Sequence, residues 1–305
     1  MNEDLLHILE HPNAELLATG FEFTEGPVWN PTDDSVYFVD VRRHQQLRWN
    51  RRTGTEIVRE NTGGGNGTTF DNCGRMLMCE GRNGRISRKD STGIWTTIAE
   101  STPELKINAP NDIVCRSDGT IYFTDPIGRQ FPSETGGREE SERMTDDSRI
   151  KLIDKSGKVV IATGALEFCN GLAFSRDEKI LYTSISFRDE RCDIEKRSGE
   201  KCPHQRILAF DVSSDGSLSN ERVFAVLASN EGSIPDGMKL DVEGRIYCTG
   251  PGGCWVFESD GSLTGIIRTR ELGSNLAFGG SDYRDLYITA RTSLYRIRTK
   301  TEGIA

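Results

Sequence analysis

The chain has 305 residues, with 38 Lys and Arg against 47 Asp and Glu, a formal net charge of −9. A net negative surface repels polyanions, so nucleic-acid binding is disfavoured. Hydrophobic residues make up 35% of the chain, which is enough for a globular core and excludes wholesale disorder. No apolar run approaches the roughly 20 residues of a membrane-spanning helix, and the acidic start at residues 1–4 does not suit a secretory signal. We therefore expect a soluble, cytoplasmic protein that does not bind membranes, and its oligomeric state stays open.

The eight cysteines include no Cys-x-x-Cys pair. Most of them lie in apolar segments, where a free cysteine acts as a small hydrophobic residue. Cys192 and Cys202 lie instead in a polar stretch. A disulfide between these two is an alternative to the reduced thiols that the cytosol would maintain.

Short segments rich in aromatic and β-branched residues recur along the chain between Gly, Pro and Asp turns, as at 36–39, 121–124 and 286–289. They align as a repeat when the residue before each strand is taken as position zero. In the units that start at Asn111, Asn170 and Asp236, apolar residues stand at positions +2 and +4, a turn pair at +7 and +8, and a second apolar run at +10 and +11, which predicts a β-hairpin. The unit at Asn66 keeps this register in its second strand, whereas the units at Glu25 and Ser274 need one and two extra residues to align. In chain order the six zero positions are Glu25, Asn66, Asn111, Asn170, Asp236 and Ser274.

A unit of about 40 residues with about four strands is typical of a propeller blade. We therefore predict an all-β protein, a six-bladed β-propeller with a central-channel metal site, formed by residues 1–305 as a single domain. Too few residues follow Ser274 for a whole blade, so the N-terminal segment near residues 14–20 is expected to close the last blade. Two polar stretches, 128–149 and 186–205, are expected to be surface insertions, the first a candidate lid that helps to set substrate size.

If the first strand of each hairpin is innermost, the zero positions converge at one end of the channel. Their side chains offer only oxygen ligands, and close carboxylates such as Glu25 and Asp236 repel each other unless a cation neutralises them. Oxygen ligands that include amides suit Ca²⁺ best, whereas no histidine falls in the register of a zinc site. An equal alternative is that these Asn-Gly and Asp-Gly pairs are ordinary turns at the entry to each blade.

A second ring is expected near position +14, on the same face as the first. Two of its members, Asp40 and Asp125, end the similar segments Tyr-Phe-Val-Asp and Tyr-Phe-Thr-Asp. These segments resemble the Tyr-Trp-Thr-Asp repeat of receptor propellers, in which the aspartate supports the fold. A supporting role is therefore the alternative to a role in the site. The other members are Glu80, Ser184, Gly250 and Ala290.

Other catalytic motifs are weak in this chain. The glycine-rich stretch 63–67 lacks the Gly-Lys-Ser/Thr ending of a phosphate-binding loop. No Gly-x-Ser-x-Gly elbow is present, which disfavours acyl transfer through a serine triad.

Several separate motifs occur in a fixed order: Phe-Thr-Glu-Gly-Pro-Val-Trp at 23–29, Pro-Asn-Asp-Ile-Val at 110–114, Asn-Gly-Leu-Ala-Phe-Ser-Arg-Asp at 170–177, Pro-Asp-Gly-Met-Lys-Leu-Asp at 235–241 and Thr-Gly-Pro-Gly-Gly at 249–253. Together they resemble the senescence-marker-protein/gluconolactonase/luciferin-regenerating-enzyme family, closest to its bacterial gluconolactonases. The resemblance implies a six-bladed propeller with one divalent metal ion in the channel. Ca²⁺ is the first choice, with Mg²⁺, Mn²⁺ or Zn²⁺ as alternatives.

The resemblance also implies roles for individual residues. Glu25, Asn170 and Asp236 match direct metal ligands, and Asn111 matches a group that reaches the metal or the substrate. Asp125 resembles a further acidic residue near the substrate in related lactonases. The mammalian members have an arginine two residues before Asn111, where this chain has alanine.

These expectations lead to the hypothesis that the protein hydrolyses a sugar lactone. In this hypothesis the metal polarises the ring carbonyl and stabilises the tetrahedral oxyanion. Asp236 or Asp125 activates water as the general base, and the sequence leaves the choice between them open. Two alternatives keep the same fold: a phosphotriester hydrolase with the same metal site, and a non-catalytic calcium-binding or interaction propeller.

Overall fold

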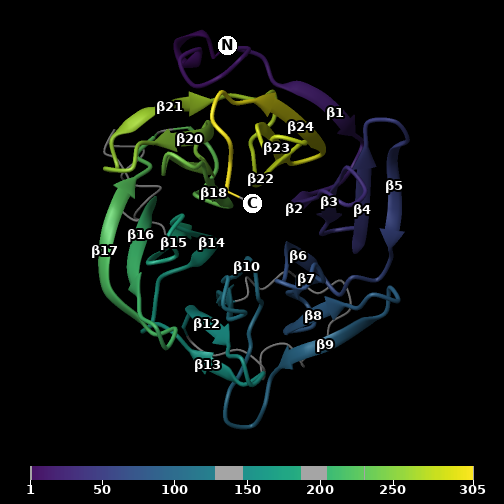
Figure 1. Cartoon of the computed structure of the whole chain (residues 1–305), viewed down its shortest axis with the longest axis vertical. Coiled ribbons are helices and arrows are strands. Elements are labelled where there is room, and N and C mark those ends of the chain that lie inside the picture. Colours follow the sequence, from purple (N-terminus) through teal and green to yellow (C-terminus); the bar gives the residue numbers. More distant parts are fainter. Residues whose placement is uncertain (1, 128–146, 187–204, 230, 305) are drawn as a thin grey trace.

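The computed structural model describes residues 2–127, 147–186, 205–229 and 231–304. Their 24 strands form six four-stranded antiparallel sheets arranged in a ring (Figure 1). The predicted six-bladed β-propeller is thus confirmed. One short helical turn, η1 (Glu3–Leu5), precedes the strands. None of the helices within the described ranges has the length and apolarity that a membrane crossing requires.

Five blades use four consecutive strands, and the first strand of each lies nearest the centre (Figure 1). The first two blades are β2 (Thr24–Asn30), β3 (Ser35–Asp40), β4 (Gln45–Asn50) and β5 (Gly54–Arg59), then β6 (Gly65–Phe70), β7 (Met76–Glu80), β8 (Arg85–Lys89) and β9 (Trp95–Glu100). The third and fourth are β10 (Ile113–Cys115), β11 (Ile121–Asp125), β12 (Arg149–Ile153) and β13 (Val159–Ile161), then β14 (Cys169–Phe174), β15 (Ile180–Ser186), β16 (Gln205–Val212) and β17 (Leu218–Val226). The fifth is β18 (Met238–Leu240), β19 (Ile246–Gly250), β20 (Gly253–Phe257) and β21 (Leu263–Ile267).

The sixth blade combines both ends of the chain. Its inner strands are β22 (Asn275–Gly279), β23 (Asp285–Ala290) and β24 (Ser293–Arg298), and its outer strand is β1 (Glu15–Thr19). β1 pairs antiparallel with β24, where Leu16 faces Tyr295 and Thr19 faces Ser293. The ring of blades is therefore held shut by hydrogen bonds between the first and last strands of the chain.

The apolar core lies between neighbouring blades. Trp29 of the first blade stacks on Tyr287 of the sixth, with ring centroids 5.6 Å apart, and Tyr247 of the fifth packs edge-on against Phe278 of the sixth at 5.2 Å. This follows from the hairpin pattern, because alternate residues of a strand face the two neighbouring blades. The polar zero positions are left at the channel end of each blade.

β-Bulges shape the channel end of three blades. In these blades the register between the first two strands shifts at or next to the zero position. The shifts lie between Glu25 and Val28, between Gly65 and Thr68, and between Cys169 and Leu172. A bulge re-aims the side chain that it carries. Most of the two predicted insertions, together with Cys192 and Cys202, lies outside the described residues.

Candidate functional site

The six zero positions form one ring around the channel. Four of these positions are followed by a glycine, and that glycine lies against the next zero position, as in the pairs Gly26–Asn66, Gly67–Asn111, Gly171–Asp236 and Gly237–Ser274. A Cβ atom on Gly26 would lie 1.9 Å from the carbonyl oxygen of Asn66, and one on Gly171 would lie 2.4 Å from that of Asp236. These distances are too short for any side chain, so glycine lets neighbouring blades approach at the channel. These contacts between neighbouring blades support the predicted convergence of the zero positions.

Hydroxyl groups near position +14 hold the ring together. The second strand of a blade donates a hydrogen bond from its hydroxyl to the carbonyl oxygen at the next zero position. The three bonds, each 2.7 Å long, are Thr124 Oγ1 to Asn170, Ser184 Oγ to Asp236, and Thr249 Oγ1 to Ser274. Ser274 Oγ in turn donates to the carbonyl of Thr24, next to Glu25, at 2.6 Å. Ser184 was predicted in the second ring, whereas Thr124 and Thr249 stand one residue before the predicted members.

Glu25 is the buried carboxylate of this ring, with only 3% of its surface exposed. Its Oε2 accepts hydrogen bonds from the Gly26 N–H at 2.8 Å and from Asn275 Nδ2 at 3.1 Å. Burial raises the pKa of Glu25 to about 7, although these two hydrogen bonds lower it. A cation placed beside such a carboxyl group would keep it ionised.

Two amide oxygens of the ring lack a hydrogen-bond donor among the described residues. Asn170 Nδ2 donates to Ser186 Oγ at 3.1 Å, which leaves the Asn170 Oδ1 atom buried and unpaired. The Oδ1 atom of Asn66 is also buried and unpaired. A buried polar atom without a partner costs about 1–3 kcal/mol, so such atoms are uncommon unless a ligand satisfies them.

The donor set fits a hard divalent cation. Glu25 and Asp236 could supply carboxylates, and Asn66, Asn111 and Asn170 could supply amide groups from three further blades. No three Asp, Glu, His or Cys side chains gather elsewhere or here within the described part of the chain, so amide oxygens have to complete the set. Carboxylate and amide oxygens are the ligands that Ca²⁺ prefers, and the unpaired oxygens of Asn66 and Asn170 suit that use. Asn66 falls in the register of the repeat but was not among the predicted ligands.

Two charged side chains near the ring were not predicted. Asp112 is buried and accepts hydrogen bonds from the backbone N–H groups of Leu172 at 3.0 Å and Ile113 at 2.9 Å. Burial raises the pKa of Asp112, and the charge of Lys239 lowers it. The Lys239 ammonium, on β18, also acts on Glu25. One sequence signal was available: Asp112 follows a zero position, where four of the other five units have glycine.

Asp125 has a different environment from the first ring. It is fully buried, and both of its oxygens accept the Asn108 N–H at 2.9 Å. Its Oδ2 also accepts a hydrogen bond from the buried ammonium of Lys151. Burial raises the pKa of Asp125, and the charge and hydrogen bond of Lys151 lower it.

The carboxylates of Asp40 and Glu80, the other acidic members of the second ring, also have hydrogen-bond or ion-pair partners. Asp40 accepts the N–H groups of Glu22 at 2.8 Å and Phe23 at 3.2 Å. Glu80 pairs with Arg59 at 2.6 Å and Arg85 at 2.7 Å. These contacts favour the supporting role that the sequence offered as the alternative for Asp40 and Asp125.

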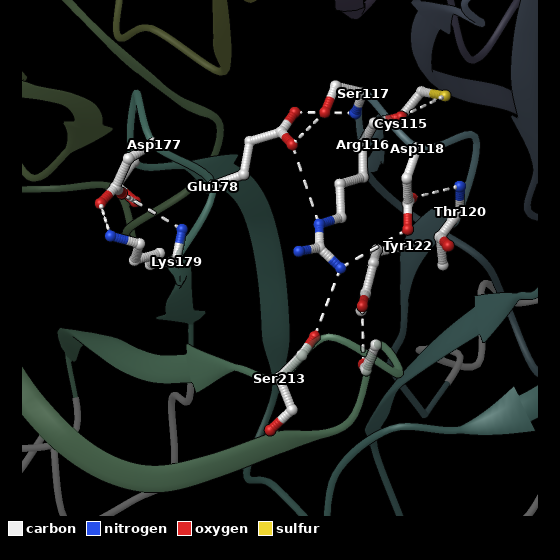
Figure 2. Close-up of polar contacts among 12 residues, drawn as sticks. Cys115, Arg116, Ser117, Asp118, Thr120, Tyr122, Asp177, Glu178, Lys179 and Ser213 are labelled. Carbon is white, nitrogen blue, oxygen red and sulfur yellow. Dashed lines mark hydrogen bonds and ion pairs between the residues drawn. The ribbon is translucent and has the colours of Figure 1, made fainter.

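A separate polar cluster lies at the turns that follow β10, β14 and β16, away from the zero positions (Figure 2). Glu178 accepts hydrogen bonds from the N–H of Ser117 at 2.7 Å and from its hydroxyl at 2.5 Å. Arg116 Nη1 donates to the carbonyl of Ser213 at 3.3 Å, and the Tyr122 hydroxyl donates to the carbonyl of Gly216 at 2.6 Å. These bonds tie the turns of the third and fourth blades together, so we interpret this cluster as structural.

Replacement of Gly171 by alanine is expected to lower the free energy of unfolding by about 1–3 kcal/mol. The added methyl would meet the backbone of Asp236 and Gly237, at 2.4 and 2.8 Å, and backbone cannot rotate away as a side chain can. Gly164→Ala is the matched control, because nothing lies within 4 Å of its Cβ position. Urea unfolding of both variants tests this, and equal stabilities would contradict the proposed close packing of the ring.

Three comparisons describe what the chain is similar to. A model of the SMP-30/Gluconolactonase/LRE-like region matches residues 23–292. A gluconolactonase from Zymomonas mobilis is 27% identical, over 95% of this chain and 82% of the relative. A pentonolactonase from Haloferax volcanii is 27% identical, over 90% of this chain and 84% of the relative. The solved structure of a gluconolactonase from Xanthomonas campestris is 26% identical and superposes with a TM-score of 0.80, covering 98% of this chain and 93% of that one.

Proposed function

Because the chain belongs to the SMP-30/Gluconolactonase/LRE-like family, we propose that it hydrolyses a sugar lactone at the channel end formed by the zero positions. The observation that carries the proposal is the convergence of Glu25, Asn170 and Asp236 in one ring that also holds unpaired, buried amide oxygens. Relatives that act on a hexonolactone and on pentonolactones support a lactone substrate.

We propose that Glu25, Asn170 and Asp236 hold one divalent cation, Ca²⁺ as the first choice, and that Asn111 completes the set or contacts the substrate. A bound cation would polarise the lactone carbonyl and stabilise the negative charge that develops on its oxygen. The buried Glu25 carboxyl supports this assignment, since a cation would keep it ionised. The Lys239 ammonium would offset part of the negative charge that Asp112 adds to the same region.

We propose Asp236 as the general base. Asp236 is a partly exposed residue, whereas Asp125 is fully buried and ion-paired with Lys151. Asp236 would accept a proton from water as the water oxygen bonds to the lactone carbonyl carbon. The bond from that carbon to the ring oxygen then breaks, and the proton returns to the ring oxygen to give the open hydroxy acid.

The test is the rate of D-glucono-1,5-lactone hydrolysis above its spontaneous background. We expect chelation to remove the enzymatic rate and the addition of Ca²⁺, Mg²⁺, Mn²⁺ or Zn²⁺, one at a time, to identify the ion that restores it. A pentonolactone measured in parallel reports on ring size. Hydrolysis of a phosphotriester but of no lactone would favour the alternative, a phosphotriester hydrolase. Tight Ca²⁺ binding without turnover of any substrate would favour a binding propeller.

A further inference from the structure

We infer that His44 and Arg82 form a subsite for an anionic group at the mouth of the channel, so that the protein prefers lactones that carry a carboxylate or a phosphate ester. This inference rests on the proposed function and deepens it. It concerns the part of the substrate that lies away from the reacting carbonyl.

The backbone places Arg82 beside the ring of zero positions. Arg82 lies in the turn between β7 and β8, and Gly64 is so close that a Cβ atom on it would lie 2.8 Å from the Cβ of Arg82. The N–H of Gly81 donates to the carbonyl of Gly64 at 3.0 Å. Gly64 precedes Asn66 by two residues, a span of at most about 7 Å. An arginine side chain or a bound sugar lactone is long enough to span this distance.

The same turn also lies beside the approach to Asn111. A Cβ atom on Gly81 would lie 3.3 Å from the carbonyl oxygen of Pro110 and 4.0 Å from the carbonyl carbon of Ala109. Arg82 is exposed at the start of this turn. A substrate held at Asn66 or Asn111 therefore has a guanidinium group within reach.

The hydrogen bonds of His44 leave one donor in excess. The N–H of Gly64 donates to His44 Nδ1 at 3.0 Å, so in a neutral ring the proton is on Nε2. Arg82 Nη1 lies 3.2 Å from that Nε2 atom, which brings two N–H groups together. The other tautomer moves the conflict to Gly64, because Nδ1–H then faces the backbone N–H. In either tautomer the imidazole accepts from only one of the two donors, and the ring offers the other no acceptor.

The charge of the imidazole does not remove the excess donor. Burial lowers the pKa of His44, and the positive charge of Arg82 lowers it further, which favours the neutral ring. A doubly protonated ring would add a donor and break the Gly64 contact. An acceptor oxygen from outside the chain, placed between Nε2–H and the guanidinium, would satisfy both groups at once.

Three other arginines of the first two blades are paired with carboxylates, unlike Arg82. Arg59 and Arg85 are both neutralised by Glu80, and Arg43 pairs with Glu22. Arg82 makes no ion pair with any of the residues that the structure describes. A guanidinium with free donors next to a neutral N–H donor matches the oxygens of a carboxylate or a phosphate.

Three lactones test the inference with wild-type protein: neutral D-glucono-1,5-lactone, D-glucaro-1,4-lactone with its carboxylate, and the 6-phosphate of D-glucono-1,5-lactone. We expect Arg82→Gln to lower kcat/KM for the preferred acidic lactone about ten-fold or more, the size of a lost charge-assisted hydrogen bond. We expect less than about a two-fold change for the neutral lactone. The two acidic lactones tell carboxylate from phosphate recognition. Arg51→Gln is the control, since it removes the same charge from a turn at the other end of the first blade.

Calorimetry separates this inference from the proposed function. Binding of D-glucarate and of 6-phosphogluconate is compared with that of the neutral polyol D-glucitol, in wild-type protein and in Arg82→Gln and His44→Gln. Anion binding that both variants weaken supports the subsite even if no lactone is hydrolysed. Lactone turnover with equal kcat/KM for neutral and acidic substrates, unchanged in Arg82→Gln, overturns the subsite and leaves the proposed function intact. Anion binding that neither variant alters overturns it as well.

Discussion

Asp236→Asn is expected to lower kcat/KM for a sugar lactone by about 10²–10⁴-fold, the usual contribution of a general base. The substitution keeps the size of the side chain and removes both its negative charge and its capacity to accept a proton from water. The backbone of Asp236 is held by Thr249 and Ser184, so the ring itself should persist. Initial rates of lactone hydrolysis and thermal unfolding, each with and without Ca²⁺, measure the two effects.

The expected thermal result is specific. The wild-type protein should gain stability as Ca²⁺ is added, because a ligand that binds only the folded state raises its melting temperature. Asp236→Asn should lose most of that gain while it melts near the wild-type temperature in chelator. Ser274→Ala is the matched control at another zero position, since the Ser274 hydroxyl is used by Thr24 and Thr289. It should lower stability and keep the Ca²⁺ response. A Ca²⁺ response and activity that survive in Asp236→Asn would refute the assignment.

The buried pair of Asp125 and Lys151 leads to the second large effect. Asp125→Asn should lower the free energy of unfolding by about 3–5 kcal/mol, because it leaves the Lys151 ammonium buried without a counter-charge. Adding Lys151→Met removes that unpaired charge, so the double variant should be more stable than Asp125→Asn alone. The asparagine oxygen can still accept the Asn108 N–H in both variants. Urea unfolding of the wild type and the two variants measures this difference.

The same variants decide between two roles for Asp125. If Asp125 only supports the connection before Asn111, the folded double variant should retain kcat/KM within about ten-fold of the wild type, since general-base loss would cost 10²-fold or more. A stable double variant with no activity would instead identify Asp125 as a catalytic group. Under the proposed mechanism, substitution of Asp236 should lower activity and leave stability in chelator nearly unchanged. Substitution of Asp125 should lower stability and leave most of the activity.

The sequence by itself determined the blades and the ring. Apolar residues at +2 and +4, a turn pair and a second apolar run are local patterns, and each specifies a hairpin without knowledge of its neighbours. Their alignment on the residue at the start of each first strand places Glu25, Asn111 and Asp236 at the same end of the propeller. The strand that completes the sixth blade could also be foreseen near residues 14–20, where β1 lies.

Only the tertiary structure decided which polar side chains at this end of the propeller have hydrogen-bond or ion-pair partners within the protein. Asp125 and Lys151 are 26 residues apart, and His44 and Arg82 are 38 apart. Both pairs depend on where neighbouring strands and blades meet. The same holds for Asn170: its amide nitrogen donates to Ser186 on the adjacent strand, and its oxygen is left unpaired. A register along the chain specifies which end of a blade a residue occupies, but hydrogen-bond partners and burial depend on distances between strands and blades that this register does not contain.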